Sequence, residues 1–219
     1  MASSIIHLAV TSELLRQRAF SSPARLKLGA ILPDAGTQTA SHLKISVCGN
    51  QKKTYDLDRY RTQFGAFLRQ DALYLGYYLH LIQDLCFRHF LYETHRWNPH
   101  IPGNVEKLHR DYAISNAYVI ARYGLQNDIV LPADFDREPI NRLCRLDAPA
   151  LLEALQAYFA SNVTGTPFFF TSDMADAFIR EAAALCLKEL DAMERGAPLL
   201  DANAHAWNNA PAQAAPEHT

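Results

Sequence analysis

The sequence predicts an all-α protein: a single helical domain of six to seven helices packed around one central buried helix at about residues 71–95. Apolar residues recur at the spacing of an α-helix over most of the chain. One such segment, residues 72–87, is apolar on nearly every side, which is typical of a helix surrounded by others. With 219 residues, of which 49% are hydrophobic, the chain is long enough to form one substantial core.

Seven segments have this helical spacing, and most are bounded by a capping residue, a proline or a glycine. They span about residues 4–20, 23–32, 58–67, 71–95, 104–124, 149–160 and 172–195. Ser3 or Ser4 can cap the first of them. Ser22 followed by Pro23 begins the second, because proline is favoured at the first helical position. Pro33 ends this helix, because the residue before a proline rarely stays helical.

The central helix and its neighbours have similar boundary signals. Asp56 or Asp58 caps the third helix, and Asp71 opens the central one. Residues 97–103 contain prolines and a glycine, which predicts a clear break in the helical structure. Asn104 then caps the fifth helix. The two remaining helices follow a long polar segment near the middle of the chain.

The segments between the helices have the composition of loops. Residues 34–41 form a loop of small residues, and residues 125–147 hold only short turns. Residues 42–48 fit either a short strand or an irregular segment. From Gly196 onward the helical pattern is lost. We therefore expect a helical domain over residues 1–195 and a flexible C-terminal tail over residues 196–219.

Composition narrows the range of partners. Lysine and arginine total 21 and aspartate and glutamate total 23, so the formal net charge is −2 and favours neither nucleic acid nor an anionic membrane. No segment fits a stable membrane anchor, and the N-terminal residues lack the basic start of a signal peptide. The four widely spaced cysteines exclude a cysteine-rich structural zinc site. We expect a cytoplasmic protein acting on a small molecule, of unknown oligomeric state.

One of the nine histidines and an aspartate, both in apolar surroundings, draw attention to the central helix. His80 and Asp84 are four residues apart, so both side chains project from the same helix face. A buried, ionised aspartate costs several kcal/mol unless it is paired or bound to a metal. The pair is therefore either a structural hydrogen bond within the core or part of a metal site.

Three further residues extend this pattern. His7 shares a helix face with apolar side chains and points at the core. Asp34 follows the helix that Pro33 ends, and His42 lies eight residues later. Each has an ordinary structural explanation when taken alone. Together with the pair on the central helix they provide three imidazoles and two carboxylates, which are the ligand types of zinc and related hydrolytic metals.

Four separated motifs in this chain occur in a characteristic order. They are Ser-Ile-Ile-His7, Leu28-Gly-Ala-Ile-Leu-Pro-Asp34, Ser41-His42 and Leu75-Gly-Tyr-Tyr-Leu-His80-Leu-Ile-Gln-Asp84. In these motifs the chain resembles the zinc-dependent phospholipase C family, including its cytoplasmic bacterial members of unassigned substrate. The resemblance covers roughly residues 2–123. It implies an all-helical fold and hydrolysis of a phosphoester by metal-activated water.

The resemblance also implies a ligand set. One metal site would be built from two carboxylates and two imidazoles, namely Asp34, His42, His80 and Asp84. His7 would take a second metal, with Asp84 bridging the two. We therefore expect one or two zinc ions, with another divalent metal as the alternative, and we expect Asp34 and Asp84 to be the catalytic carboxylates.

The next helix departs from the family pattern, because secreted members carry a further histidine and an H-x-x-x-E or similar pair there. Here the helix has His109, Asp111 and Tyr112. His109 and Asp111 are two residues apart and face different sides of the helix, so only one of them can point at the metals. We expect these residues to contact substrate or to add a ligand, and a partly buried polar helix face is the alternative.

A histidine and a glutamate further along the central helix have the spacing of metal ligands but face away from His80. His89 and Glu93 form an H-x-x-x-E pair, yet His89 lies nine residues after His80, about 180° around the helix. Together with Arg88, this pair is interpreted as a solvated face. The remaining histidines fall in loops or in the tail.

The favoured function is therefore a metal-dependent hydrolase, with a phosphoesterase resembling phospholipase C as the specific expectation. One alternative is an HD-like nucleotide phosphohydrolase, which is disfavoured because the chain contains no His-Asp dipeptide. Another is a non-enzymatic helical protein with structural His–Asp contacts, in which the five candidate ligands would be scattered in space. The motifs of Rossmann, P-loop, serine hydrolase and H-E-x-x-H enzymes are missing from the sequence.

Overall fold

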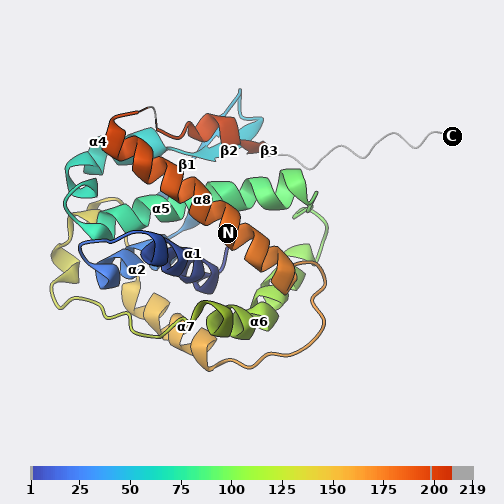
Figure 1. The fold of residues 1–219 in the computed structure, drawn as a ribbon. Helices are drawn as coiled ribbons and strands as arrows, with labels where there is room; N and C mark the ends of the chain where they lie inside the picture. The colour runs from blue at the N-terminus through green and yellow to red at the C-terminus, as the bar shows by residue number, and fades with distance from the viewer. Residues whose placement is uncertain (1, 198, 209–219) are drawn as a thin grey trace.

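The structure is a computed structural model, and it describes residues 2–197 and 199–208. These residues form seven helices of nine residues or more and one single-turn helix. The helices are α1 (Ser4–Gln17), α2 (Pro23–Ile31), α3 (Gln38–Ser41), α4 (Leu57–Leu68), α5 (Ala72–Arg88), α6 (Asn104–Tyr123), α7 (Ala148–Ala160) and α8 (Ser172–Arg195). Figure 1 shows α5 in the middle of the molecule with the other helices around it. The predicted all-α class and the central helix are confirmed.

Helix α5 is buried on almost its whole circumference, and Leu75 is its only partly exposed residue. Its closest neighbour is α2, and two glycines allow the two backbones to approach each other. A Cβ atom on Gly29 would lie 2.1 Å from the carbonyl oxygen of Leu73, and one on Gly76 would lie 2.3 Å from that of Leu26. This close crossing places the end of α2 directly against the polar residues of α5.

The end of α5 corrects one prediction. The α-helix ends at Arg88 and continues as a π-helical segment over His89–Thr94. His89 is exposed, as expected, but Arg88 is only 9% exposed. Its guanidinium packs against the rings of Tyr92 and Trp207. The interpretation of Arg88 as part of a solvated face is therefore wrong, because a distant aromatic residue covers it.

A small antiparallel sheet lies on one side of α5. Its strands β1 (Lys44–Val47), β2 (Lys52–Tyr55) and β3 (Trp207–Asn208) are arranged in the order β1-β2-β3. Lys53 pairs with Trp207 in the register of the last two strands. The segment that the sequence left undecided between strand and irregular structure is therefore mostly strand.

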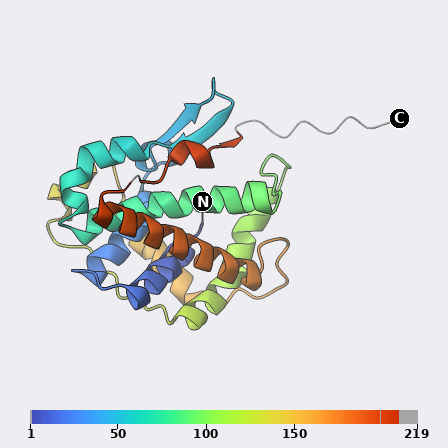
Figure 2. The ribbon, with the colours of Figure 1, turned by 45° about the horizontal axis from the view of Figure 1, so that its top comes forward.

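The chain after α8 differs from the expected flexible tail. Residues 199–208, here called the C-terminal segment, return to the sheet and end in strand β3 (Figure 2). The backbone N–H of Leu200 donates to Glu189 at 2.8 Å, and Thr54 donates to the carbonyl oxygen of Ala202 at 2.6 Å. The prediction of a flexible tail is wrong for this segment, because its contacts are with residues far away in sequence. Residues 209–219 of that tail lie outside the described residues.

Among the described residues, no helix combines the length and the apolar character that crossing a membrane would require.

Candidate metal centre

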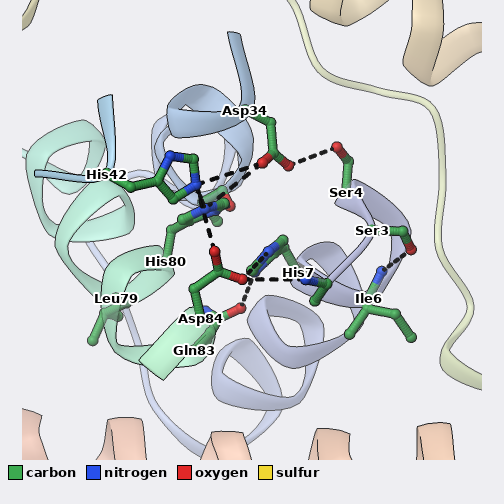
Figure 3. Close-up of polar contacts among 12 residues, drawn as sticks. Ser3, Ser4, Ile6, His7, Asp34, His42, Leu79, His80, Gln83 and Asp84 are labelled. Carbon is green, nitrogen blue, oxygen red and sulfur yellow. Dashed lines mark hydrogen bonds and ion pairs between the residues drawn. The ribbon is translucent and has the colours of Figure 1, made fainter. Parts of the chain in front are cut away.

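Five side chains from four separate parts of the chain converge beside the crossing of α2 and α5. Helix α1 provides His7, the 3₁₀ turn after α2 provides Asp34, the residue after α3 is His42, and α5 provides His80 and Asp84. Figure 3 shows their imidazole and carboxylate groups directed at a common region. Four of the five are fully buried, and the side chain of Asp34 is 12% exposed. The scattered arrangement expected of a non-enzymatic helical protein is not observed.

Hydrogen bonds fix the protonation of two of the imidazoles. The Nδ1 atom of His80 lies 2.7 Å from the carbonyl oxygen of Ala30. The Nδ1 atom of His7 lies 2.8 Å from the side-chain carbonyl oxygen of Gln83. A carbonyl oxygen can only accept a hydrogen bond, so in both rings Nδ1 carries the proton. The Nε2 atom of each neutral ring is then left with a free lone pair.

His42 also carries its proton on Nδ1, but its hydrogen-bond partner is a hydroxyl group. The Nδ1 atom of His42 lies 3.0 Å from the hydroxyl oxygen of Ser41, which itself donates to the carbonyl oxygen of Thr37 at 2.8 Å. The hydroxyl proton is thus in use, so Ser41 accepts from His42 Nδ1 and Nε2 has the lone pair. The Nε2 atoms of His42 and His80 are 3.0 Å apart. Two facing lone pairs at this distance repel each other unless a cation lies between them.

The ligand atoms of Asp34, His42 and His80 lie close enough together to share one zinc ion, and His42 also lies near Asp84. His42 Nε2 lies 3.5 Å from Asp84 Oδ2 and 3.7 Å from Asp34 Oδ1, and His80 Nε2 lies 3.9 Å from the same Asp34 oxygen. Bonds of about 2.0–2.1 Å in a tetrahedral site separate the ligand atoms by about 3.3 Å. Asp34 Oδ1 is also buried, and it has no hydrogen-bond partner within the part of the chain that the structure describes. Such an atom is expected where a metal completes the site.

A second position lies on the other side of Asp84. Its Oδ1 atom is 3.5 Å from Nε2 of His7, another buried atom for which the described residues provide no hydrogen-bond partner. Asp84 therefore presents one oxygen to His42 and the other to His7, which is the arrangement of a bridging carboxylate. His80 is close enough to join either group, but it has only one free nitrogen and can serve only one ion.

The electrostatics keep the Nε2 atoms of His42 and His80 available near neutral pH. Burial lowers the pKa of His42 to about 4 and that of His80 well below its usual value, so both rings are neutral at pH 7. Burial raises the pKa of Asp34 to about 6. For Asp84 burial acts in the same direction, but the interaction with the nearby His7 outweighs it and holds the pKa well below its usual range. Burial opposes protonation of His7, yet Asp84 raises its pKa above the usual value.

A cavity of about 650 Å³ adjoins this centre, and Asp34 lies on its wall. Much of the remaining wall comes from α6 and α7. Besides Asp34, the polar and aromatic residues among those that line it are Ser3, Ser4, Gln38, His109, Tyr112, Asn116, Asp147 and Tyr158. Because Asp34 is also the one partly exposed member of the centre, the cavity gives access to the metal ligands from the outside.

The candidates on α6 separate into two groups. His109 and Tyr112 line the cavity, as expected for residues that contact a substrate. Asp111 faces elsewhere: its carboxylate accepts hydrogen bonds from three consecutive backbone N–H groups of residues 168–170 at 2.7–2.8 Å. The structure therefore does not bring Asp111 to the centre. As its two-residue offset from His109 indicated, only one of the two points toward the cavity.

Several supporting contacts were missed by the sequence reasoning. Tyr55 donates from its hydroxyl to Asp84 Oδ2 at 3.3 Å, and Ser4 donates to Asp34 Oδ2 at 3.0 Å. No spacing rule connects these pairs, because each joins two distant elements. Gln83 could have been found, since a glutamine beside Asp84 in an apolar helix needs a polar partner of its own.

Comparison with known proteins supports the resemblance. A family model for zinc dependent phospholipase C matches residues 3–160, which is well over half of the chain and includes all five converging residues. Searches of curated proteins and of solved structures gave no match. Zinc is the metal of this family, and the groups His7/His80/Asp84 and Asp34/His42/His80 are positioned to bind such an ion. The chain therefore belongs to the zinc-dependent phospholipase C family and is a phospholipase C-like hydrolase.

Proposed function

We propose that this hydrolase is a zinc-dependent phosphoesterase that cleaves a small phosphate ester with activated water. The observation that carries the proposal is the distance of 3.0 Å between the Nε2 atoms of His42 and His80 in a buried site. Core histidines that serve only a structural role would share a proton or turn away from each other. Here hydrogen bonds to both Nδ1 atoms hold the lone pairs face to face.

The ligand assignment follows from the free atoms. We assign the first ion to two carboxylates and two imidazoles, namely Asp34, His42, His80 and Asp84. A second ion would be bound by His7 Nε2 and Asp84 Oδ1, with its other positions open to water or substrate. Bound zinc supplies Lewis acidity, which polarises a phosphoryl oxygen and lowers the pKa of a water molecule.

The protein's own residues would hold the ligands and admit the substrate. Ala30, Ser41 and Gln83 fix the orientation of the three rings, a role that partners of metal ligands commonly have. Ser4 holds Oδ2 of Asp34 and leaves Oδ1 directed toward the metal position. Asp34 would therefore bind the metal at the point where the centre opens to the cavity.

The composition of the cavity wall supports a metal-bound phosphate. Among the described residues that line the cavity there is no lysine or arginine. The negative charge of a phosphoester would thus have to be met by the zinc ions. His109 and Tyr112 are the proposed contacts to the rest of the substrate, and partial burial lowers the pKa of His109, so its ring is neutral at pH 7.

Zinc content and hydrolysis of chromogenic esters test this function. The purified protein is expected to contain one or two zinc ions by elemental analysis and to hydrolyse bis(p-nitrophenyl) phosphate or p-nitrophenyl phosphate. Asp84→Asn should lose at least about a hundredfold in activity. The matched control is Asp58→Asn, which removes a carboxylate whose side chain is 87% exposed. Absence of zinc from the wild-type protein, or equal activity in Asp84→Asn, would refute the proposal.

A further inference from the structure

We propose that the C-terminal segment holds the metal centre in its binding geometry through a chain of contacts from Trp207 to Arg88, Tyr55 and Asp84. This segment lies outside the part of the sequence that the family model matches. The inference rests on the proposed function, because it takes Asp84 to be a zinc ligand. It assigns positioning roles to residues that do not touch the metal themselves.

The chain of contacts begins at Asp84. The hydroxyl of Tyr55 donates to Asp84 Oδ2 at 3.3 Å, and the tyrosine is almost completely buried. Burial raises the pKa of Tyr55 above its usual value, so the hydroxyl keeps its proton and acts as the donor in this pair. The hydrogen bond acts on the carboxylate that faces both metal positions and limits its rotation.

The next member is Arg88, which lies one helical turn after Asp84 on α5. Its guanidinium is buried, and within the described part of the chain no carboxylate lies within ion-pair distance of it. It donates a hydrogen bond to the hydroxyl of Tyr92, and its charge acts on the nearby hydroxyl of Tyr55. Asp84 is the carboxylate whose charge acts on it. Tyr55 thus lies near a buried cation and donates its hydrogen bond to a buried anion.

Trp207 covers these two residues from the sheet. Its indole ring lies 5.4 Å from the guanidinium carbon of Arg88 and 5.1 Å from the ring centre of Tyr55, in an edge-to-face arrangement with the tyrosine. An aromatic face against a desolvated cation is attractive and excludes water from it. Trp207 therefore restricts the movement of both Arg88 and Tyr55.

The backbone around Trp207 is fixed at several points. Strand β3 pairs with β2, which is the strand that carries Tyr55. Thr54, the neighbour of Tyr55, donates to the carbonyl oxygen of Ala202. Figure 2 shows the C-terminal segment and the β1–β2 hairpin together on the same side of α5. The segment can therefore transmit its position to the metal ligand through a short and rigid path.

Zinc release and cobalt spectra test this path. Zinc-loaded wild-type protein, Tyr55→Phe and Trp207→Ala are mixed with a chromophoric chelator, and the rate of zinc transfer is measured. The same proteins loaded with Co²⁺ report ligand geometry through their visible absorption. The matched control is Trp97→Ala: Trp97 is buried to a similar degree, 7% exposed against 5%, but it packs on Phe169, away from the centre.

We expect Tyr55→Phe and Trp207→Ala to release zinc about 10–100 times faster and to change the cobalt spectrum. Trp207→Phe should restore most of the wild-type behaviour, because it keeps an aromatic face over Arg88. Trp97→Ala should lower the melting temperature while leaving the spectrum unchanged. This combination separates an effect on ligand position from general loosening of the fold.

Two results would overturn this inference and leave the proposed function intact. One is a wild-type protein that binds zinc while Tyr55→Phe and Trp207→Ala release it at the wild-type rate with an unchanged cobalt spectrum. The other is an equal change in Trp97→Ala. A wild-type protein that binds neither zinc nor cobalt would instead refute the proposed function on which the inference rests.

Discussion

Asp84 on α5 and Asp111 on α6 are both buried aspartates in the middle of a helix, but their surroundings differ in kind. The oxygens of Asp111 accept hydrogen bonds from three backbone N–H groups. Those of Asp84 accept from Tyr55 and from the backbone N–H of Ala2, and each also faces the Nε2 atom of a histidine. The contacts of Asp111 are with donors, whereas Asp84 faces two histidine nitrogens in addition to its two donors.

This difference shows what distinguishes a metal ligand from a structural carboxylate. Burial and helix position are the same in the two cases, so neither identifies the functional residue. The decisive property is whether the neighbouring atoms can donate a proton. Acceptors that are held facing one another in a buried site require a cation, and donors around a carboxylate do not.

The largest expected effect is on zinc binding by the two aspartate variants. Asp84→Asn should weaken zinc binding about a hundredfold or more, because removing one of four ligands costs on the order of 3 kcal/mol of a total of about 10–16 kcal/mol. Asp111→Asn should bind zinc as the wild-type protein does. Competition with a chelator of known affinity measures both. Equal losses in the two variants would remove the distinction between the residues.

A somewhat smaller effect is expected on the stability of the metal-free protein. Asp111→Ala leaves three backbone N–H groups of residues 168–170 without their acceptor, which should lower the free energy of unfolding by about 2 kcal/mol. Denaturant unfolding in the presence of a chelator gives this value. If the variant unfolds like the wild-type protein, Asp111 does not have the structural role assigned to it.

The third effect concerns the orientation of an imidazole. Ser41→Ala removes the hydroxyl that accepts from His42 Nδ1 and should weaken zinc binding about tenfold, because partners of metal ligands commonly contribute this much or more. Ser12→Ala is a suitable control, since Ser12 is part-buried and bonds to a carbonyl oxygen far from the centre. An unchanged affinity in Ser41→Ala would mean that packing alone orients the ring.

The smallest effect is expected from a change of pH between 7 and 6. Zinc competes with protons for its ligands, and with a pKa of about 6 for Asp34 and about 4 for His42, little proton uptake occurs above pH 6. Below pH 6 the affinity of the first position should fall about tenfold per unit as Asp34 is protonated. Zinc titrations at several pH values measure this. A decline centred at pH 6.5–7 would show that His42 titrates as an ordinary histidine.

Much of the fold could be predicted because helices are local. The seven long helices follow from apolar spacing together with caps and prolines within each segment, such as Ser22 before Pro23 and Asp71 before α5. The sheet could not be predicted in the same way. Strand β3 consists of two residues whose partner lies about 150 positions earlier, so no local pattern marks it.

In the candidate site, too, local features could be predicted and long-range contacts could not. The spacing of His80 and Asp84 and the order of the motifs indicated all five converging residues. The hydrogen bonds that fix the imidazole protons could not be predicted, because they join backbone or side-chain groups brought together only by folding. Arg88 was misinterpreted for the same reason, since its neighbour Trp207 comes from the other end of the chain.

The glycine crossing of α2 and α5 has a consequence for the choice of metal. Because Gly29 and Gly76 bring the two backbones together, the carbonyl group of Ala30 reaches the ring of His80, and Asp34 is placed within 3.9 Å of the same ring. The spacing of these ligands thus depends on main-chain packing as well as on the side chains. Larger cations such as Ca²⁺, which need six to eight oxygen ligands at 2.3–2.6 Å, do not match a centre of three imidazoles and two carboxylates.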